Sequence, residues 1–282
     1  MQKRILGIIA GGGALPVEVA KACTDQDLPF YMVRLSGFAG SEIEKYPGEE
    51  CSIAEVGKII YVLNEHECTD VVLAGLVDRP DFKKLKPDLR GARLLPKVIA
   101  AARHGDGALL KLLVEVLEGE GFKVIGVDDI TKSILAKAGT FGAIAPSPAH
   151  LSDIKKAASV IDALGKFDIG QGAVVAAGHV LAVEAAEGTD KMLARCADFS
   201  DDLRGSDGAN GVLVKRPKPD QELRVDLPTI GVETIKRIAA AKLAGVAVEA
   251  DRALVMDAAE MIAEADRAGI FVYGFSAAEI DD

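Results

Sequence analysis

The residues best suited to chemistry lie in one stretch of 17 residues in the second half of the chain. This stretch, KRPKPDQELRVDLPTIG (residues 215–231), places three cations ahead of Arg224 and Asp226. Lysine and arginine bind phosphate, and an aspartate binds Mg²⁺ or handles a proton. The turn after Asp226 leads into a helix N-terminus, where backbone N–H groups favour anions. The stretch therefore suits cleavage of a phosphate or pyrophosphate ester. A basic surface loop with a capping turn explains these residues equally well.

A second group of oxygen-bearing side chains lies around a predicted hairpin. Gln171 precedes the hairpin, and Glu184, Glu187, Thr189 and Asp190 follow it in the segment EAAEGTDKML. Carboxylates on one short connection, with a hydroxyl between them, can hold a hard cation through oxygen. Thr189 and Asp190 also fit the start of a helix over residues 190–197, so helix capping is the alternative for Asp190.

Three consecutive glycines, Gly11, Gly12 and Gly13, follow the first predicted strand and precede a helix. A phosphate-binding turn belongs at this position of an α/β domain. The G-x-G-x-x-G pattern would need a glycine in place of Pro16, and the second strand ends in Arg34 rather than an acid that holds the NAD ribose. We therefore expect a nucleotide or phosphate here and disfavour an NADP-linked oxidoreductase using Arg34. A tight strand–helix turn is the structural alternative.

Asp78 and Arg79 follow the third predicted strand. At the carboxyl edge of a parallel sheet they would face the same crevice as the glycines, and Arg79 could pair with phosphate or uracil oxygens. An Asp–Arg pair on the surface is the structural alternative.

Alternating elements predict the fold of the first half. Strands separated by helices imply a parallel sheet with helices on both faces, so residues 1–132 are expected to form a Rossmann-like domain. The expected strands are residues 4–9, 30–35, 71–75 and 122–127, and the expected helices are residues 15–25, 54–66, 93–103 and 107–119.

The remainder, residues 133–282, predicts a mixed α/β domain that carries Asp226. Residues 139–148 contain two prolines and are interpreted as a linker and candidate hinge. The turn Ala177-Gly178 predicts a hairpin. Further expected strands are residues 211–215, 245–249, 253–256 and 270–274, and further expected helices are residues 151–164, 230–244 and 258–268.

Composition excludes several classes of protein. A net charge of −10 argues against general nucleic-acid binding. The four cysteines are far apart, which indicates neither a zinc site nor a disulfide framework. Neither a signal peptide nor a long apolar span is visible, so a cytoplasmic location is expected. The absence of a Walker A motif counts against an ATPase.

Three segments, RVDLPTIG (224–231), EGTD (187–190) and IAGGGALP (9–16), resemble the LpxI-type UDP-2,3-diacylglucosamine pyrophosphatases of lipid A synthesis. The resemblance extends over nearly the whole chain. It implies Mg²⁺-dependent hydrolysis of UDP-2,3-diacylglucosamine to UMP and 2,3-diacylglucosamine 1-phosphate (lipid X). A non-catalytic nucleotide-sugar-binding protein is the alternative function.

The resemblance also implies roles for individual residues. Asp226 matches the catalytic aspartate, which would bind Mg²⁺ or orient the attacking water, and Lys215 and Thr189 complete the expected catalytic group. The metal ligands expected with Asp226 are Glu187 and Asp190. The expected substrate-binding residues are Gly11, Gly12, Gly13, Asp78, Arg79, Gln171, Lys218, Arg224 and Thr229.

The expected lipid partner follows from the same resemblance. The substrate is a lipid-linked UDP-sugar, so peripheral contact with the cytoplasmic face of the inner membrane is expected. No nucleic-acid partner is expected, and a homodimer is a possible assembly.

Overall fold

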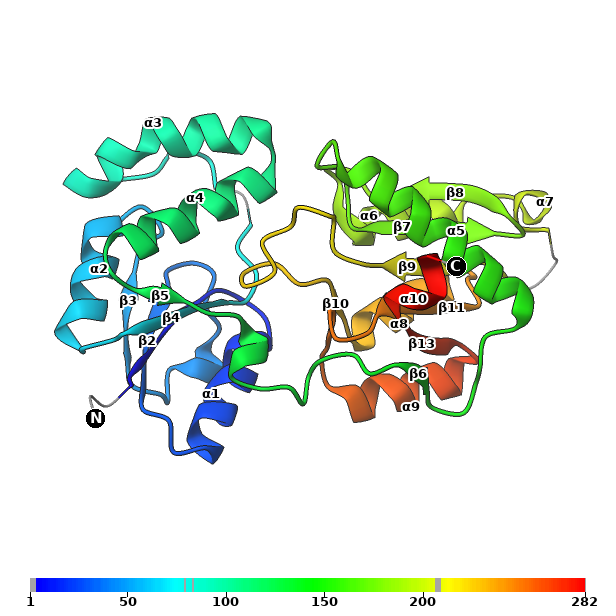
Figure 1. Cartoon of the computed structure of the whole chain (residues 1–282), viewed down its shortest axis with the longest axis horizontal. Coiled ribbons are helices and arrows are strands. Elements are labelled where there is room, and N and C mark those ends of the chain that lie inside the picture. The colour runs from blue at the N-terminus through cyan, green and yellow to red at the C-terminus, as the bar shows by residue number, and fades with distance from the viewer. Residues whose placement is uncertain (1–3, 79, 83, 206–208, 282) are drawn as a thin grey trace. The chain divides into compact units, whose positions relative to one another are not determined.

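The computed structural model describes residues 4–78, 80–82, 84–205 and 209–281. The chain divides into two compact units, and Figure 1 labels most of their helices and strands. The first unit contains Met1–Lys132 and Glu222–Asp226, and the second contains Ser133–Gln221 and Leu227–Asp282. Asp226 was expected in the second domain, but it belongs to the first unit. The five residues Glu222–Asp226, which we call the excursion, leave the second unit and pack with the first.

The first unit is built on a five-stranded parallel sheet of order β3-β2-β1-β4-β5, which confirms the predicted Rossmann-like class. Four of its strands correspond to the predicted ones, whereas β3 was not predicted. The strands are β1 (Leu6–Ala10), β2 (Phe30–Leu35), β3 (Gly48–Cys51), β4 (Asp70–Ala74) and β5 (Lys123–Val124).

Helices connect these strands, and two of them, α3 and α4, follow one another between β4 and β5 (Figure 1). Strand order reverses between β1 and β4, the position at which open α/β sheets bind ligands beyond the carboxyl ends of their strands. The helical elements are α1 (Leu15–Asp25), η1 (Ser41–Ile43), α2 (Val56–Glu65), α3 (Leu89–His104), α4 (Asp106–Gly119) and η2 (Val127–Asp129).

The second unit is built on a six-stranded mixed sheet of order β6-β13-β11-β9-β7-β8, which confirms the predicted mixed class. Strands β9, β11 and β13 are parallel, and β6, β7 and β8 pair antiparallel. A separate parallel pair joins β10 and β12. The strands are β6 (Gly139–Phe141), β7 (Gly172–Ala176), β8 (His179–Val183), β9 (Val212–Lys215), β10 (Thr229–Ile230), β11 (Gly245–Glu249), β12 (Leu254–Val255) and β13 (Phe271–Phe275).

Both faces of this sheet are buried. Along β9, Leu213 belongs to one apolar cluster while Val212 and Val214 belong to another, the period-two alternation of a strand covered on both sides. The helices of the unit are α5 (Pro148–Gly165), α6 (Gly188–Ala197), α7 (Asp201–Arg204), α8 (Val232–Ala240), α9 (Ala258–Ala268) and α10 (Ala277–Asp281). No helix in the described part of the chain is long and apolar enough to cross a membrane.

The interpretation of residues 139–148 as a linker is wrong for its first residues. Gly139–Phe141 forms the edge strand β6, which pairs antiparallel with β13 and completes the sheet. The prediction of a hairpin is confirmed, since β7 and β8 pair around Ala177 and Gly178, both with positive φ. The buried Asp153 carboxylate accepts hydrogen bonds from both turn amides, at 3.0 and 2.8 Å.

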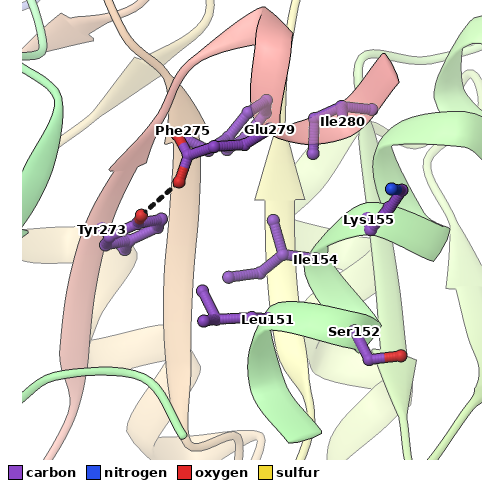
Figure 2. A pocket seen from close by; sticks show the side chains of 8 residues that line it. All are labelled: Leu151, Ser152, Ile154, Lys155, Tyr273, Phe275, Glu279 and Ile280. Carbon is purple, nitrogen blue, oxygen red and sulfur yellow. Dashed lines mark hydrogen bonds between the residues drawn. The ribbon is translucent and has the colours of Figure 1, made fainter. Parts of the chain in front are cut away.

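A pocket of about 400 Å³ lies between α5, β13 and α10 (Figure 2). The Tyr273 hydroxyl donates a 2.6 Å hydrogen bond to Glu279, which, together with burial, raises the pKa of Tyr273 to about 12. None of the predicted site residues is among those that line it: Leu151, Ser152, Ile154, Lys155, Tyr273, Phe275, Glu279 and Ile280.

A substitution at Gly75 tests the close backbone packing at the ends of β1 and β4. Its φ is +98°, and a Cβ would lie 2.5 Å from the Gly12 carbonyl oxygen. We expect Gly75→Ala to lower the free energy of unfolding by about 2 kcal/mol or more, measured by urea denaturation. The control is Gly119→Ala at the end of α4, where a Cβ has no atom within 4 Å and helix propensity favours alanine. Equal stability of the two variants would contradict the packing described.

Candidate functional site

The glycine turn lies where β1 and β4 end side by side. Gly11 donates a 2.8 Å backbone hydrogen bond to Ala74, and Gly12 and Leu76 exchange two of 2.8 Å. A Cβ on Gly11 would lie 2.6 Å from the Leu76 carbonyl oxygen, and one on Gly12 would lie 2.9 Å from that of Phe38. Gly11 and Gly12 are therefore required by close backbone approach, and their amides are already paired.

Gly13 is the third residue of the turn and differs from the first two. It has φ +82°, and the helix α1 starts two residues later with Pro16 in its first turn. In α1, Pro16 has no N–H and the Val17 N–H donates 3.0 Å to the Ala14 carbonyl, so the N–H groups ahead of Pro16 are the ones suited to an anion. Gly13 and the start of α1 are thus the part of the turn able to approach a phosphate.

The segment after β4 lies beside this turn through the Gly12–Leu76 pair. Asp78 is exposed there, close in the chain to Leu76, whose side chain is 76% exposed. Arg79, predicted to bind the substrate, lies outside the described residues.

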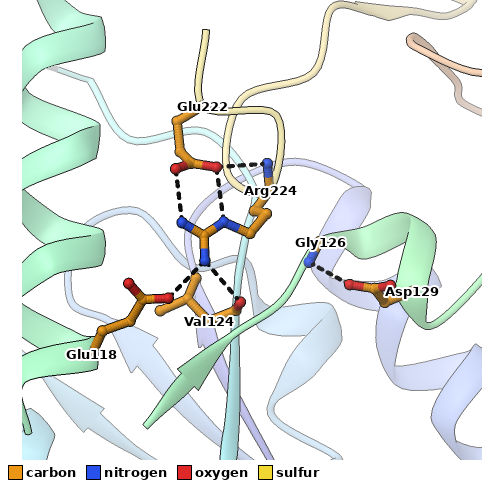
Figure 3. A network of polar contacts seen from close by, with 6 residues as sticks. All are labelled: Glu118, Val124, Gly126, Asp129, Glu222 and Arg224. Carbon is orange, nitrogen blue, oxygen red and sulfur yellow. Dashed lines mark hydrogen bonds and ion pairs between the residues drawn. The ribbon is translucent and has the colours of Figure 1, made fainter. Parts of the chain in front are cut away.

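The excursion Glu222–Asp226 is held to the first unit by Arg224 (Figure 3). Its guanidinium donates to both Glu222 carboxylate oxygens at 2.8 Å, to Glu118 of α4 at 2.6 Å and to the Val124 carbonyl at 3.4 Å. These contacts raise the pKa of Arg224, and the bond from Arg224 lowers the pKa of Glu222. We call Arg224, Glu222 and Glu118 the Arg224 cluster.

Arg224 was predicted to bind the substrate. In the structure its guanidinium donates instead to acceptors of the protein, which indicates a positioning role. Planar pairing of a guanidinium with a carboxylate through two parallel bonds is a strong and directional contact. The prediction from sequence could not separate these uses, because a phosphate and a carboxylate attract the same side chain.

Asp226 lies at the end of this excursion and is half-buried. Its N–H donates 3.1 Å to the Glu222 carbonyl, which closes the turn, and Val225 packs on the apolar core of the first unit. Gly126 lies two residues after β5, and a Cβ on it would be 3.5 Å from the Arg224 Cα. Asp226 is therefore held near the carboxyl end of β5.

One sheet edge brings the glycine turn and Asp226 together. In the order β1-β4-β5, neighbouring parallel strands are about 4.8 Å apart, so β1 and β5 lie about 10 Å apart across the sheet. The last residue of β5, Val124, pairs with Val71 near the start of β4, and the chain after β5 continues toward the carboxyl edge. The segment with Asp78 follows the strand between them. This edge of the first unit is the candidate functional site.

The second unit holds the remaining predicted residues at several places. Lys215 ends β9, is buried, and its ammonium donates 3.0 Å to the Thr229 carbonyl. Lys218 forms an ion pair with Asp168. The Gln171 side-chain oxygen accepts a 3.0 Å bond from Gln221. Lys215 and Thr229 are thus brought together, and so are Gln171 and the loop that carries Lys218.

Two buried carboxylates organise this unit: Glu184, one of the predicted cation-binding acids, and Glu249, which the sequence did not identify. The Glu184 carboxylate accepts hydrogen bonds from the Thr189 hydroxyl at 2.9 Å and from the Gln171 backbone N–H at 3.3 Å. It therefore connects Thr189 and Gln171, two of the predicted site residues. Glu249, at the end of β11, accepts from Arg216 at 3.0 Å and from Arg252 at 2.9 Å. An acid that ends an apolar strand, as in GVAVE, was the available signal for Glu249.

Arg216 is one of the three cations that suggested phosphate binding. Its side chain is buried and pairs with Glu249 and, at 2.7 Å, with Asp162. It therefore supports the backbone between Lys215 and Lys218.

Two of the predicted metal ligands, Glu187 and Asp190, lie in the second unit. Glu187 pairs with Arg195 at 3.0 Å, and Asp190 pairs with Arg237 at 3.0 Å. Within the residues that the structure describes, no group of three or more His, Cys, Asp or Glu side chains could hold a metal ion. Glu187 and Asp190 thus each pair with an arginine of the second unit, whereas Asp226 belongs to the first.

Comparison with known proteins gives a family for both halves of the chain. The family model described as the LpxI N-terminal domain matches residues 5–134, and the one described as the LpxI C-terminal domain matches residues 137–273. A curated relative from Caulobacter vibrioides, UDP-2,3-diacylglucosamine pyrophosphatase LpxI, is 50% identical over 96% of this chain and 97% of its own.

A search of solved structures matches N5-carboxyaminoimidazole synthase from Aspergillus clavatus. The match has 10% identity and a TM-score of 0.25, and it covers 66% of this chain and 42% of that one. A likeness at this level carries no argument about function.

The Arg224 cluster predicts that Arg224→Ala loosens the excursion. We expect amide hydrogen exchange of residues 222–226 to become roughly tenfold faster, because several partly exposed charge-assisted bonds are lost. Lys123→Ala, an exposed change on neighbouring β5, serves as the control and should leave this exchange unaltered.

The lowered pKa of Glu222 adds a pH readout to the same experiment. The ionised Glu222 carboxylate stabilises the folded excursion above the ordinary glutamate pKa of about 4.3. This stabilisation is lost as the pH falls through the lowered pKa of Glu222. Protection of residues 222–226 should therefore weaken in acid in the unmodified chain, and less so in Arg224→Ala. The same acid response in both would contradict the role of the cluster.

Proposed function

The chain belongs to the LpxI family, and we propose that it hydrolyses the pyrophosphate bond of UDP-2,3-diacylglucosamine to UMP and 2,3-diacylglucosamine 1-phosphate. The single observation that carries this proposal is 50% identity to a curated enzyme of that name over nearly the full length of both chains. The protein is then a hydrolase of lipid A synthesis. Family models that match both halves support the same conclusion.

In this reaction, water adds to one phosphorus of the diphosphate. The bridging P–O bond breaks, and its electron pair stays with the departing phosphate. Asp226 would orient the water or accept its proton, roles that suit a half-buried carboxylate held by the backbone of a closed turn. The support is positional, since Asp226 and the glycine turn belong to one edge of the first unit.

The substrate contacts that we propose use both kinds of group described above. Gly13 and the start of α1 would approach a phosphate, while Gly11 and Gly12 allow the turn its shape. Asp78 and Arg79 remain proposed contacts from the neighbouring loop. The proposed contacts from the second unit are Lys215, Lys218, Gln171, Thr189 and Thr229. The two lysines would reduce the charge that develops on the phosphoryl oxygens.

Magnesium dependence is part of the proposal, with a smaller ligand set than the sequence suggested. Mg²⁺ is commonly bound by one or two carboxylates together with substrate phosphates, and Asp226 is the carboxylate that we propose for this role. Such an ion would neutralise charge on the diphosphate. Glu187 and Asp190 are assigned to their arginine pairs instead.

The proposed setting is the cytoplasm, with the substrate drawn from the cytoplasmic face of the inner membrane. A homodimer is the proposed assembly, and nucleic acid is not a proposed partner.

The role of Asp226 predicts the outcome of a matched pair of variants. Asp226→Asn should lower the rate of UMP release roughly 10²–10⁴-fold, the usual contribution of a general base or metal ligand, with circular dichroism unchanged. Asp220→Asn, an exposed change in the same loop, should retain activity. If the unmodified protein binds the substrate with Mg²⁺ present yet releases no UMP, it is a non-catalytic binding protein and the proposal fails.

The ion pairs of Glu187 and Asp190 predict a second outcome. The double variant Glu187→Gln and Asp190→Asn should keep the Mg²⁺ concentration for half-maximal activity within about threefold, because exposed pairs contribute little. A ligand role would instead weaken metal activation strongly. Titration of UMP release with MgCl₂ after EDTA treatment distinguishes the two.

A further inference from the structure

Positive charge is concentrated in one segment of this acidic protein. The whole chain carries −10, yet residues 84–104 contain six basic side chains and a single acid, Asp88. The basic residues are Lys84, Lys86, Arg90, Arg93, Lys97 and Arg103. Such separation creates a local positive surface that the net charge hides.

The helix α3 presents most of this charge on one face. Of its residues, all of them described, only Gly91 and Ala102 are buried, while Leu95 and Val98 are half-buried on the same side. This side packs against α2 and α4, and Figure 1 shows α3 running along α4. At 100° per residue, the exposed residues Arg93 and Lys97 fall on the opposite face.

Few acids of the protein neutralise this face. Arg90 pairs with Glu120 and Lys84 pairs with Asp81. Within the described chain, Arg93, Lys97 and Arg103 have no carboxylate within ion-pair distance.

Asp88 has a different use. It caps two helices at once, since its carboxylate accepts 2.7 Å from Gly91 of α3 and 3.0 Å from Lys58 of α2. Because α2 and α3 both follow carboxyl ends of sheet strands, this cap places the start of the basic helix at the same edge as the glycine turn. Leu89, the first residue of α3, is 84% exposed there.

We propose that α3 with its preceding lysines docks the protein on an anionic lipid surface. Exposed cations next to an exposed leucine match a bilayer whose surface is negative and whose interior is apolar. The rest of the chain is acidic and would be repelled by that surface, so contact would occur through this helix alone. This inference rests on the proposed function, which requires the substrate to be taken from a bilayer.

The test is vesicle co-sedimentation of the full chain. We expect binding to phosphatidylcholine vesicles only when phosphatidylglycerol is added, and release by salt. Arg93→Gln with Lys97→Gln should lower the partition coefficient roughly 30-fold, given the usual contribution of each cation near such a surface. The matched control is Lys45→Gln with Lys132→Gln, two exposed lysines outside α3, and it should bind as the unmodified chain does.

Several outcomes would overturn the proposal. These are equal binding to neutral and anionic vesicles, no loss in the α3 variant, or the same loss in the control. Tighter binding to duplex DNA than to anionic vesicles at the same salt would assign the face to nucleic acid, and self-association lost only in the α3 variant would assign it to a second copy.

A measurement of UMP release tests the proposed function independently of membrane docking. With detergent-dispersed UDP-2,3-diacylglucosamine, the α3 variant should release UMP at the unmodified rate. Absence of UMP from every form would refute the proposed function, whereas the vesicle result would still decide the docking proposal.

Discussion

The candidate site depends on the pairing of the Arg224 guanidinium with two glutamates of the first unit, Glu222 and Glu118. Glu222 and Glu118 come from parts of the chain about a hundred residues apart, and Arg224 bonds to both. This contact returns five residues from the second half of the sequence to the first unit. Together with the packing of Val225 on the apolar core of the first unit, it holds Asp226 near the carboxyl end of β5.

Close backbone packing supplies the other half of the site. The turn after β1 and the turn after β4 exchange hydrogen bonds through Gly12 and Leu76, at a separation that leaves no space for a Cβ on Gly11 or Gly75. A rigid turn of this kind can present the start of α1 to a phosphate without reorganising. Preorganised donors are effective because their orientation is already set when charge develops.

Periodicity in the sequence was sufficient to predict most elements. Apolar runs such as LGIIA and GVAVE identify buried strands, and Ala177-Gly178 identifies the hairpin. Short edge strands were harder, since Gly139–Phe141 shows no apolar run and is defined only by its pairing with β13. The excursion of residues 222–226 was not predictable, because it depends on a contact between distant charges that local pattern does not encode.

The same limit applies to the roles of charged residues. Arg216 and Arg224 have the appearance of phosphate ligands in the sequence, yet both are paired with carboxylates of the protein. Glu249 was missed because its importance comes from burial, and Glu184 was predicted as a cation ligand although it accepts hydrogen bonds from Thr189 and Gln171. The role of each of these arginines depends on the carboxylate that lies beside it in the folded protein.

The most direct test is a crystal structure of the Asp226→Asn protein with UDP-2,3-diacylglucosamine bound. We expect the diphosphate at the carboxyl edge of the first sheet, with one phosphate at Gly13 and the start of α1 and the other within about 3 Å of a residue 226 side-chain atom or of a metal held there. A diphosphate bound elsewhere, out of reach of both the glycine turn and residue 226, would contradict the account.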